Sequence, residues 1–168
     1  MRNLAGLALV VTALFSWPES AYSQGRSAEG RSMKNSQIVF VCEHGAALSV
    51  VSAAYFNKLA REQNLNVRAI ARGTTPQKDI SVSARAGLKA DGVTLDTKRP
   101  KALSPQDAAH ALRIVAFLPL PAKYSKMAPV QTWDDVPPTG ANYSAARDAI
   151  LKHLKELLSE LSQNDRVR

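Results

Sequence analysis

The segment from Ile38 to Ser49 constrains the fold of this chain more than any other segment. It begins with an unbroken apolar run, residues 38–41, which is typical of a central parallel strand buried on both faces. Cys42 follows directly, and a short loop leads into a helix that we expect from about Ser49 to Gln63. The carboxyl end of such a strand, facing the first N–H groups of the next helix, is a place where proteins bind anions and lower thiol pKa values. The segment therefore predicts an α/β domain with thiolate chemistry on an oxyanion.

Strands and helices alternate after this segment. Further strands are expected at residues 67–71 and 113–118, with a short one near 130–133, and helices at 81–90, from Ser104 onward, and at 143–162. This alternation predicts a parallel sheet, in which ligands bind at the carboxyl ends of the strands, near a topological switch point. Three loops should meet there: residues 42–49, residues 72–79 and the segment after Leu118.

The first residues differ in composition from the rest of the chain. Arg2 precedes an apolar run from Leu4 to Phe15, and small residues surround Tyr22, which is the pattern of a secretory signal peptide over residues 1–23. An uncleaved membrane anchor is the alternative; after cleavage, no stable membrane span is expected. Residues 24–36 are predicted to be a flexible linker, residues 37–162 the folded domain and residues 163–168 a C-terminal tail. The chain is therefore expected to be exported, to the periplasm or out of the cell.

The formal net charge of +8 admits nucleic acid, a membrane surface or an acidic small molecule as a partner. No run of five basic residues occurs, and no aromatic residues are interleaved with the basic positions, so nucleic acid is not expected as a partner. A basic solvated surface is the simpler interpretation. Cys42 is the only cysteine, which excludes an internal disulfide.

The pattern Val-Phe-Val-Cys-x-x-Gly-x-x-x-Ser, from Val39 to Ser49, resembles the low molecular weight protein tyrosine phosphatases and the related thioredoxin-coupled arsenate reductases. The similarity continues through residues 71–74, 88–93, 133–138 and 143–150, and so spans about residues 37–160. The resemblance implies a flavodoxin-like fold, with a four-stranded parallel sheet and flanking helices.

The resemblance also implies site residues. Cys42 takes the position of the nucleophile, whose thiolate attacks phosphorus, and Ser49 takes the position of the hydroxyl that supports the thiolate. Gly45 takes a position that is usually asparagine in a left-handed conformation, which glycine adopts without strain. The oxyanion-binding loop comprises Glu43, His44, Gly45, Ala46, Ala47 and Leu48.

The chain departs from the family at Leu48, which stands where an arginine clamps the phosphate. Losing one fixed donor to developing charge typically costs on the order of 10²–10³ in rate, and Glu43 adds negative charge beside the site. Three features offer compensation: protonation of His44, approach of Arg72 from the neighbouring strand, and the backbone nest with its helix dipole. The alternatives are a solvent-facing or capping role for His44 and a surface role for Arg72.

The general acid of the family is an aspartate that precedes a proline in a mobile loop. Here residues 134–137 read Asp-Asp-Val-Pro, which makes Asp135 the first candidate and Asp134 the second. The alternative is that both residues cap the short strand. In the arsenate reductase branch a second cysteine follows the third strand, where this chain has Leu118, so that only an external thiol would complete such a cycle.

No metal or other cofactor is expected. Cys42 and His44 alone are a fragment of a soft-metal site, and His110 and His153 lie far along the chain on predicted helix surfaces. The sequence therefore favours an exported, weak phosphomonoester hydrolase that acts through Cys42, with a small oxyanion, a phosphomonoester or a phosphoprotein as its partner. One alternative is an inactive oxyanion-binding or interaction module on the same fold, and another is an arsenate reductase-like protein that uses an external thiol.

Overall fold

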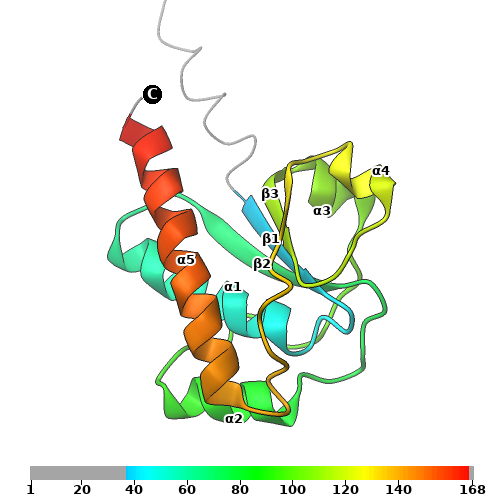
Figure 1. The fold of residues 1–168 in the computed structure, drawn as a ribbon, viewed down its shortest axis with the longest axis vertical. Helices are drawn as coiled ribbons and strands as arrows, with labels where there is room; N and C mark the ends of the chain where they lie inside the picture. The colour runs from blue at the N-terminus through cyan, green and yellow to red at the C-terminus, as the bar shows by residue number, and fades with distance from the viewer. Residues whose placement is uncertain (1–36, 167–168) are drawn as a thin grey trace, which may run out of the picture.

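The computed structural model describes residues 37–166 and contains one four-stranded parallel sheet in the order β2-β1-β3-β4. The strands are β1 (Gln37–Cys42), β2 (Arg68–Gly73), β3 (Ala111–Ala116) and β4 (Val130–Thr132). Figure 1 shows this sheet with helices on both sides. The expected flavodoxin-like α/β architecture is confirmed. The proposed signal peptide and linker, residues 1–36, lie outside the described residues.

The helices are α1 (Leu48–Glu62), α2 (Val82–Ala90), α3 (Pro105–Ala109), α4 (Ala122–Ser125) and α5 (Tyr143–Arg166). The long helices α1 and α5 pack with α2 on one face of the sheet, where Phe40 and Phe56 belong to the larger apolar core. The short helices α3 and α4 cover the other face, where Tyr124 packs with Val39 in a smaller core. Among the described residues, no helix is both long enough and apolar enough to span a bilayer.

The first strand is the centre of the molecule because its side chains are buried on both faces. The four residues from Ile38 to Val41 have no exposed surface, as the apolar run predicts. Alternate residues enter opposite cores, because successive side chains of a strand point to opposite faces. At the carboxyl end Cys42 pairs with Gly73 of β2 and Val41 with Ala116 of β3, so three strand ends meet at one edge.

Several boundaries differ from those expected. The third strand was expected at residues 113–118, but it runs from Ala111 to Ala116, and the chain then turns while the Phe117 N–H still donates to the Val41 carbonyl. Helix α4 was not expected. The last helix continues to Arg166, beyond its expected end at Ser162 and into the expected tail, because residues 163–166 contain no glycine or proline to stop it.

The short helix α3 forms where its sequence signals predict. Ser104 accepts a hydrogen bond from the Asp107 N–H, and the Asp107 carboxylate accepts one from the Ser104 N–H, each at 3.0 Å. Pro105 occupies the first helical turn, where its missing N–H costs nothing.

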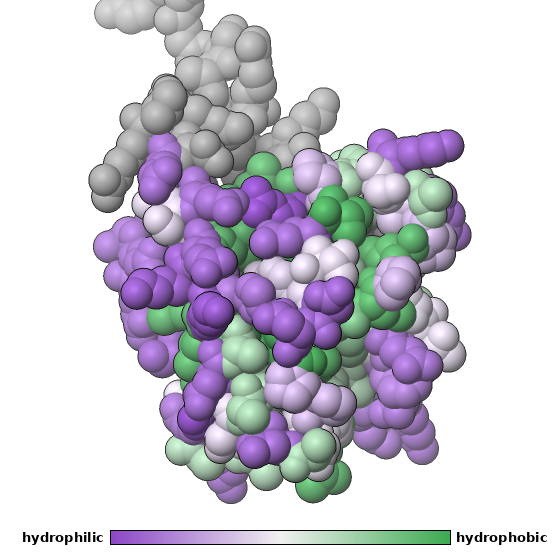
Figure 2. Space-filling model, viewed as in Figure 1, coloured by the Kyte–Doolittle hydropathy of each residue, from purple (hydrophilic) through white to green (hydrophobic). Residues whose placement is uncertain are grey.

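The surface on the side shown in Figure 2 is largely hydrophilic, with apolar side chains in scattered patches.

Candidate functional site

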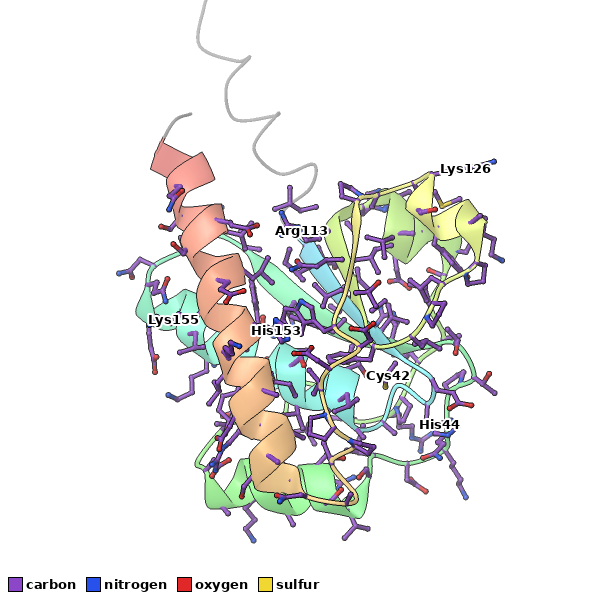
Figure 3. All side chains as sticks on the ribbon, in the orientation of Figure 1. Cys42, His44, Arg113, Lys126, His153 and Lys155 are labelled. Carbon is purple, nitrogen blue, oxygen red and sulfur yellow. The ribbon has the colours of Figure 1, made fainter. Side chains whose placement is uncertain are left out.

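Cys42 is the last residue of β1, and its side chain is 7% exposed. Its Sγ lies 3.1 Å from the Oγ of Ser49, which is fully buried in the first turn of α1. In this arrangement the hydroxyl can donate a hydrogen bond to the thiolate when the thiol ionises. The structure thus brings together the two residues for which the resemblance implies the roles of nucleophile and supporting hydroxyl. Figure 3 shows Cys42 at the end of β1 and His44 farther out on the loop.

The loop between Cys42 and α1 is held from one side only. The carbonyls of residues 42, 43, 44 and 46 accept hydrogen bonds from N–H groups of the segment 74–81, at 3.1, 2.8, 3.1 and 2.9 Å. The described peptide bonds are trans, so each following N–H points the opposite way. The N–H groups of residues 43, 44, 45 and 47 therefore face away from that segment. In the part of the chain that the structure describes, they have no protein acceptor. Such a row of N–H groups forms a nest for an anion.

Helix α1 adds its own unpaired N–H groups to this nest. Its N-cap is Ala47, which has no side-chain acceptor, and no side chain caps this end. By contrast, Ser81 and Ser104 cap α2 and α3 with their hydroxyl oxygens. The N-terminus of α1 thus presents free donors and the positive end of a helix dipole beside Cys42. Together, the loop and the helix can hold the oxygens of a tetrahedral anion through backbone groups alone.

A cavity of about 450 Å³ opens over this nest. The loops 42–49 and 72–79 contribute to its lining, as expected, and the segment after Leu118 contributes residues 138–140; Phe117 and Leu118 come just before that segment. The lining residues are Cys42, Glu43, His44, Ala47, Leu48, Gln77, Ser81, Phe117, Leu118, Pro138, Thr139 and Gly140. The convergence follows from the parallel topology, because every strand ends at the same edge of the sheet.

The charges around this cavity are few and lie at its mouth. The Nδ1 of His44 is 3.3 Å from the Thr75 carbonyl, and its Nε2 is 3.8 Å from the Glu43 carboxylate. The side chains of His44 and Glu43 are 45% and 68% exposed. Leu48 lines the cavity as an apolar group. The His44 side chain is therefore accessible to an anion, but it lies beside a carboxylate.

Arg72 does not approach Cys42, so the expectation that it compensates for Leu48 is wrong for this structure. Its Nε and Nη2 donate to the two carboxylate oxygens of Asp107 at 2.9 and 2.8 Å, and its Nη1 donates to the Ala71 carbonyl. The side chain lines a separate cavity of about 190 Å³ along the edge of β2. Arg72 is thus a structural residue that fixes β2 to α3.

Neither candidate for the general acid reaches the cavity. Asp134 and Asp135 are exposed and are absent from the cavity lining, although the same loop supplies Pro138 and Thr139 to it. Asp135 lies against α5, where its Oδ1 is 2.7 Å from the Nε2 of His153. The hydrogen bond with His153 holds the pKa of Asp135 below its usual value, which favours the ionised form and not the protonated form that a general acid needs.

Sequence reasoning missed several lining residues. Gln77 and Ser81 lie in or just after a loop that was expected at the site, but nothing in the pattern singled them out. Phe117 directly precedes Leu118 at the end of β3, so its position follows once the strand boundary is known. Thr139 is buried, and its Oγ1 accepts from the Ser83 hydroxyl, a contact that sequence spacing does not reveal. Among the side chains that the structure describes, no three of His, Cys, Asp or Glu lie close enough to hold a metal ion.

The chain matches no protein-family model and no curated protein sequence. Its fold, however, matches solved structures. YfkJ from Bacillus subtilis has 18% identity and a TM-score of 0.69, over 83% of this chain and 99% of that protein. The low molecular weight protein tyrosine phosphatase SP-PTP from Streptococcus pyogenes has 14% identity and a TM-score of 0.60, over 74% and 92%. The thioredoxin-dependent arsenate reductase of Corynebacterium glutamicum has 16% identity and a TM-score of 0.58, over 77% and 63%. At these identities the likeness establishes the fold, which this chain shares with both kinds of enzyme.

Proposed function

We propose that this chain is a divergent, exported member of the low molecular weight phosphatase superfamily and hydrolyses phosphomonoesters slowly through Cys42. The observation that carries the proposal is the 3.1 Å contact between Cys42 Sγ and Ser49 Oγ at the base of a loop of free N–H groups. The related structures, a tyrosine phosphatase and an arsenate reductase, are named for tetrahedral oxyanion chemistry. Export rests on the composition of residues 1–23.

The proposed reaction has two displacements at phosphorus. The Cys42 thiolate attacks the phosphoryl group, an S–P bond forms, and the P–O bond to the leaving group breaks. The leaving group departs with the electron pair of that bond, as an aryloxide that solvent water protonates where needed. Backbone N–H groups of residues 43, 44, 45 and 47 hold the remaining oxygens, and Ser49 stabilises the thiolate before attack and after release. Water then attacks phosphorus, the S–P bond breaks, and inorganic phosphate leaves with the proton of the water passing to solvent.

Two features of the site make this reaction slow. Leu48 provides no charge for the transferring group, and the loss of one fixed donor costs on the order of 10²–10³ in rate. The loop acid is also missing from the cavity, because Asp135 is paired with His153 on α5. We therefore expect measurable turnover only with esters whose leaving group needs little protonation, such as aryl phosphates.

A second candidate function is an oxyanion-binding module without turnover. The lack of a charged side chain at Leu48 and of an acid from the Asp135 loop in the cavity favours it. A third candidate, an arsenate reductase-like thiol protein, requires an external thiol, because Leu118 lines the cavity where that branch carries its next cysteine. The first two candidates share the binding site and differ only in whether Cys42 forms a covalent intermediate.

An assay of the full chain with p-nitrophenyl phosphate under reducing conditions separates the first two candidates. We expect slow phosphate release that disappears in Cys42→Ser and rises in Leu48→Arg, with Leu48→Gln as the matched control for polarity without charge. Activity in Leu48→Arg alone identifies a scaffold that has lost turnover. No activity in either protein, with both shown to be folded, contradicts a phosphatase function for this loop.

A further inference from the structure

The cavity over Cys42 offers an anion many backbone dipoles and little positive charge. Among its described lining residues there is neither lysine nor arginine, and Arg72 is held by Asp107 in another cavity. His44 is the one lining side chain that can become a cation, and its Nε2 lies 3.8 Å from the Glu43 carboxylate. A bound anion is therefore stabilised mainly by backbone N–H groups and not by a fixed cation.

The lining of the cavity also includes groups that can carry negative charge. Glu43 is one of the lining residues, and Cys42 is another, whose reactive form is the thiolate. A second charge on the ligand meets these like charges without a neighbouring cation to offset it. The site thus discriminates against the dianion of a phosphate monoester more than against a monoanion of the same shape.

The rest of the lining is suited to an apolar group on the ligand. Leu48, Phe117, Leu118 and Pro138 contribute to the wall, and the cavity volume of about 450 Å³ exceeds what a bare oxyanion fills. Leu48 stands in the position where a cationic clamp would otherwise occupy space. An organic substituent therefore finds apolar contact on the side where the related enzymes have charge.

We propose that the Cys42 cavity selects singly charged tetrahedral oxyanions that carry an apolar group over doubly charged phosphate monoesters. Phosphate diesters and phosphonate monoesters are the phosphorus compounds that combine these properties. The inference deepens the proposed function, because it depends on the same assignment of the loop to oxyanion binding.

Protection of Cys42 from alkylation by iodoacetamide measures binding without turnover. Because Cys42 is the only cysteine of the chain, the modification reports on this site alone. The ligands are methyl phenylphosphonate and benzenesulfonate as monoanions, phenylphosphonate as the dianion at mildly alkaline pH, and benzyl alcohol as the neutral control. In the full chain, we expect the monoanions to give half-protection at concentrations about three- to tenfold lower than the dianion.

Variants test the electrostatic cause. Leu48→Arg should strengthen binding of the dianion by about tenfold or more, because it adds charge-assisted hydrogen bonds. The dianion should then bind more tightly than the monoanions, which reverses the preference of the unmodified chain. Leu48→Gln, which adds polarity without charge, should keep the original order. Glu43→Gln, a change at an exposed position, should reduce the ratio between the half-protection concentrations of the dianion and the monoanions by about two- to fivefold. Thermal unfolding of each variant confirms that the comparison is made between folded proteins.

Three results would overturn the inference: equal or tighter binding of phenylphosphonate in the unmodified chain, protection by benzyl alcohol equal to that by benzenesulfonate, or no protection by any ligand. Hydrolysis of an aryl phosphate is measured separately. A chain that releases phosphate but prefers the dianion retains the proposed function and loses this inference.

Discussion

Gly45, in the loop after Cys42, and Gly73, the last residue of β2, pack backbone against backbone. A Cβ added to Gly45 would lie 2.7 Å from the Gly73 nitrogen, and one added to Gly73 would lie 2.6 Å from the Gly45 nitrogen. Gly45 also has a φ of +61°, in the left-handed region that L-residues avoid. The shape of the loop therefore depends on two glycines from neighbouring strand ends, only one of which needs an unusual backbone conformation.

Alanine substitutions should separate these two requirements. We expect Gly45→Ala to lower the free energy of unfolding by about 2–5 kcal/mol, the sum of left-handed strain and overpacking. Gly73→Ala should cost about 1–3 kcal/mol from overpacking alone. Urea unfolding measures both values, and both variants should lose oxyanion binding because the nest is displaced.

Gly92 supplies the control for strain without contact. It has a φ of +64° and no atom within 4 Å of an added Cβ. Gly92→Ala should therefore cost only about 1–2 kcal/mol and leave binding at Cys42 intact. A cost for Gly45→Ala no larger than that for Gly92→Ala would show that the loop moves away from Gly73 without penalty.

Arg72→Ala should destabilise the fold without affecting chemistry at Cys42. The Arg72 and Asp107 side chains are only 17% and 15% exposed, so removal of one partner leaves a charged group largely buried, at a cost of about 1–3 kcal/mol. Burial opposes ionisation of Asp107, but hydrogen bonds from Arg72 and Ser104 outweigh it and lower its pKa. The test compares urea unfolding with aryl phosphate turnover per folded molecule. A large loss of turnover at unchanged stability would contradict the structural role and indicate that Arg72 acts in the reaction at Cys42.

Asp135→Asn tests whether the loop between β4 and α5 brings an acid to the cavity. Because Asp135 is paired with His153 and ionised, we expect its substitution to leave turnover of an aryl phosphate nearly unchanged. Removal of a true general acid typically lowers the rate on the order of 10²–10⁴. A loss of that size, confirmed with an ester whose leaving group is poor, would show that the loop closes over Cys42 during the reaction.

Acid stability should depend on Asp91, which joins three helices. The hydroxyls of Tyr55 in α1 and Tyr143 in α5 donate to Asp91 Oδ2, the latter at 2.9 Å, and Arg147 approaches Oδ1 at 3.3 Å. The hydrogen bond from Tyr55 is the main cause that lowers the pKa of Asp91. The stabilising contribution of a carboxylate with a lowered pKa is complete above its unfolded pKa of about 3.9 and is lost as pH falls through the folded value.

The corresponding measurement is the unfolding free energy of wild type and Asp91→Asn between neutral and strongly acidic pH. Wild type should lose stability below about pH 4, and Asp91→Asn should start less stable and lose less. At the alkaline end, burial raises the pKa of Tyr143 to about 12. The contribution of Tyr143 to stability is therefore complete below its unfolded pKa of about 10 and is lost as pH rises through the folded value of about 12. If both proteins lost the same unfolding free energy between neutral and acidic pH, Asp91 would be excluded as the cause of the acid sensitivity.

The central sheet could be predicted from sequence because its signal is local: residues 38–41 form an apolar run. The Cys42–Ser49 pair was implied by the resemblance of residues 39–49 to the phosphatase loop, and the two side chains are in contact in the structure. The partners of Arg72 and Asp135 could not be predicted in this way. Arg72 binds a carboxylate 35 residues away, and Asp135 meets His153 across 18 residues, so each contact depends on how helices dock on the sheet.

The lining of the cavity was predictable at the level of loops but not of residues. Parallel strands bring their carboxyl ends to one edge, which places residues 42–49, 72–79 and the segment after β3 together. Which side chains of those loops turn inward depends on exact strand ends, and β3 ends two residues earlier than expected. Phe117 enters the site for that reason.

Trapping of a phosphocysteine tests directly whether the Cys42 thiolate attacks phosphorus, as we propose. The full chain and Cys42→Ala are mixed with an aryl [³²P]phosphate, quenched in acid and analysed for labelled protein, with Leu48→Arg as the variant that should accumulate more. We predict label on wild type and on Leu48→Arg that maps to Cys42, and none on Cys42→Ala. Phosphate release by Cys42→Ala at the wild-type rate, or turnover by Leu48→Arg without any labelled cysteine, would contradict the account.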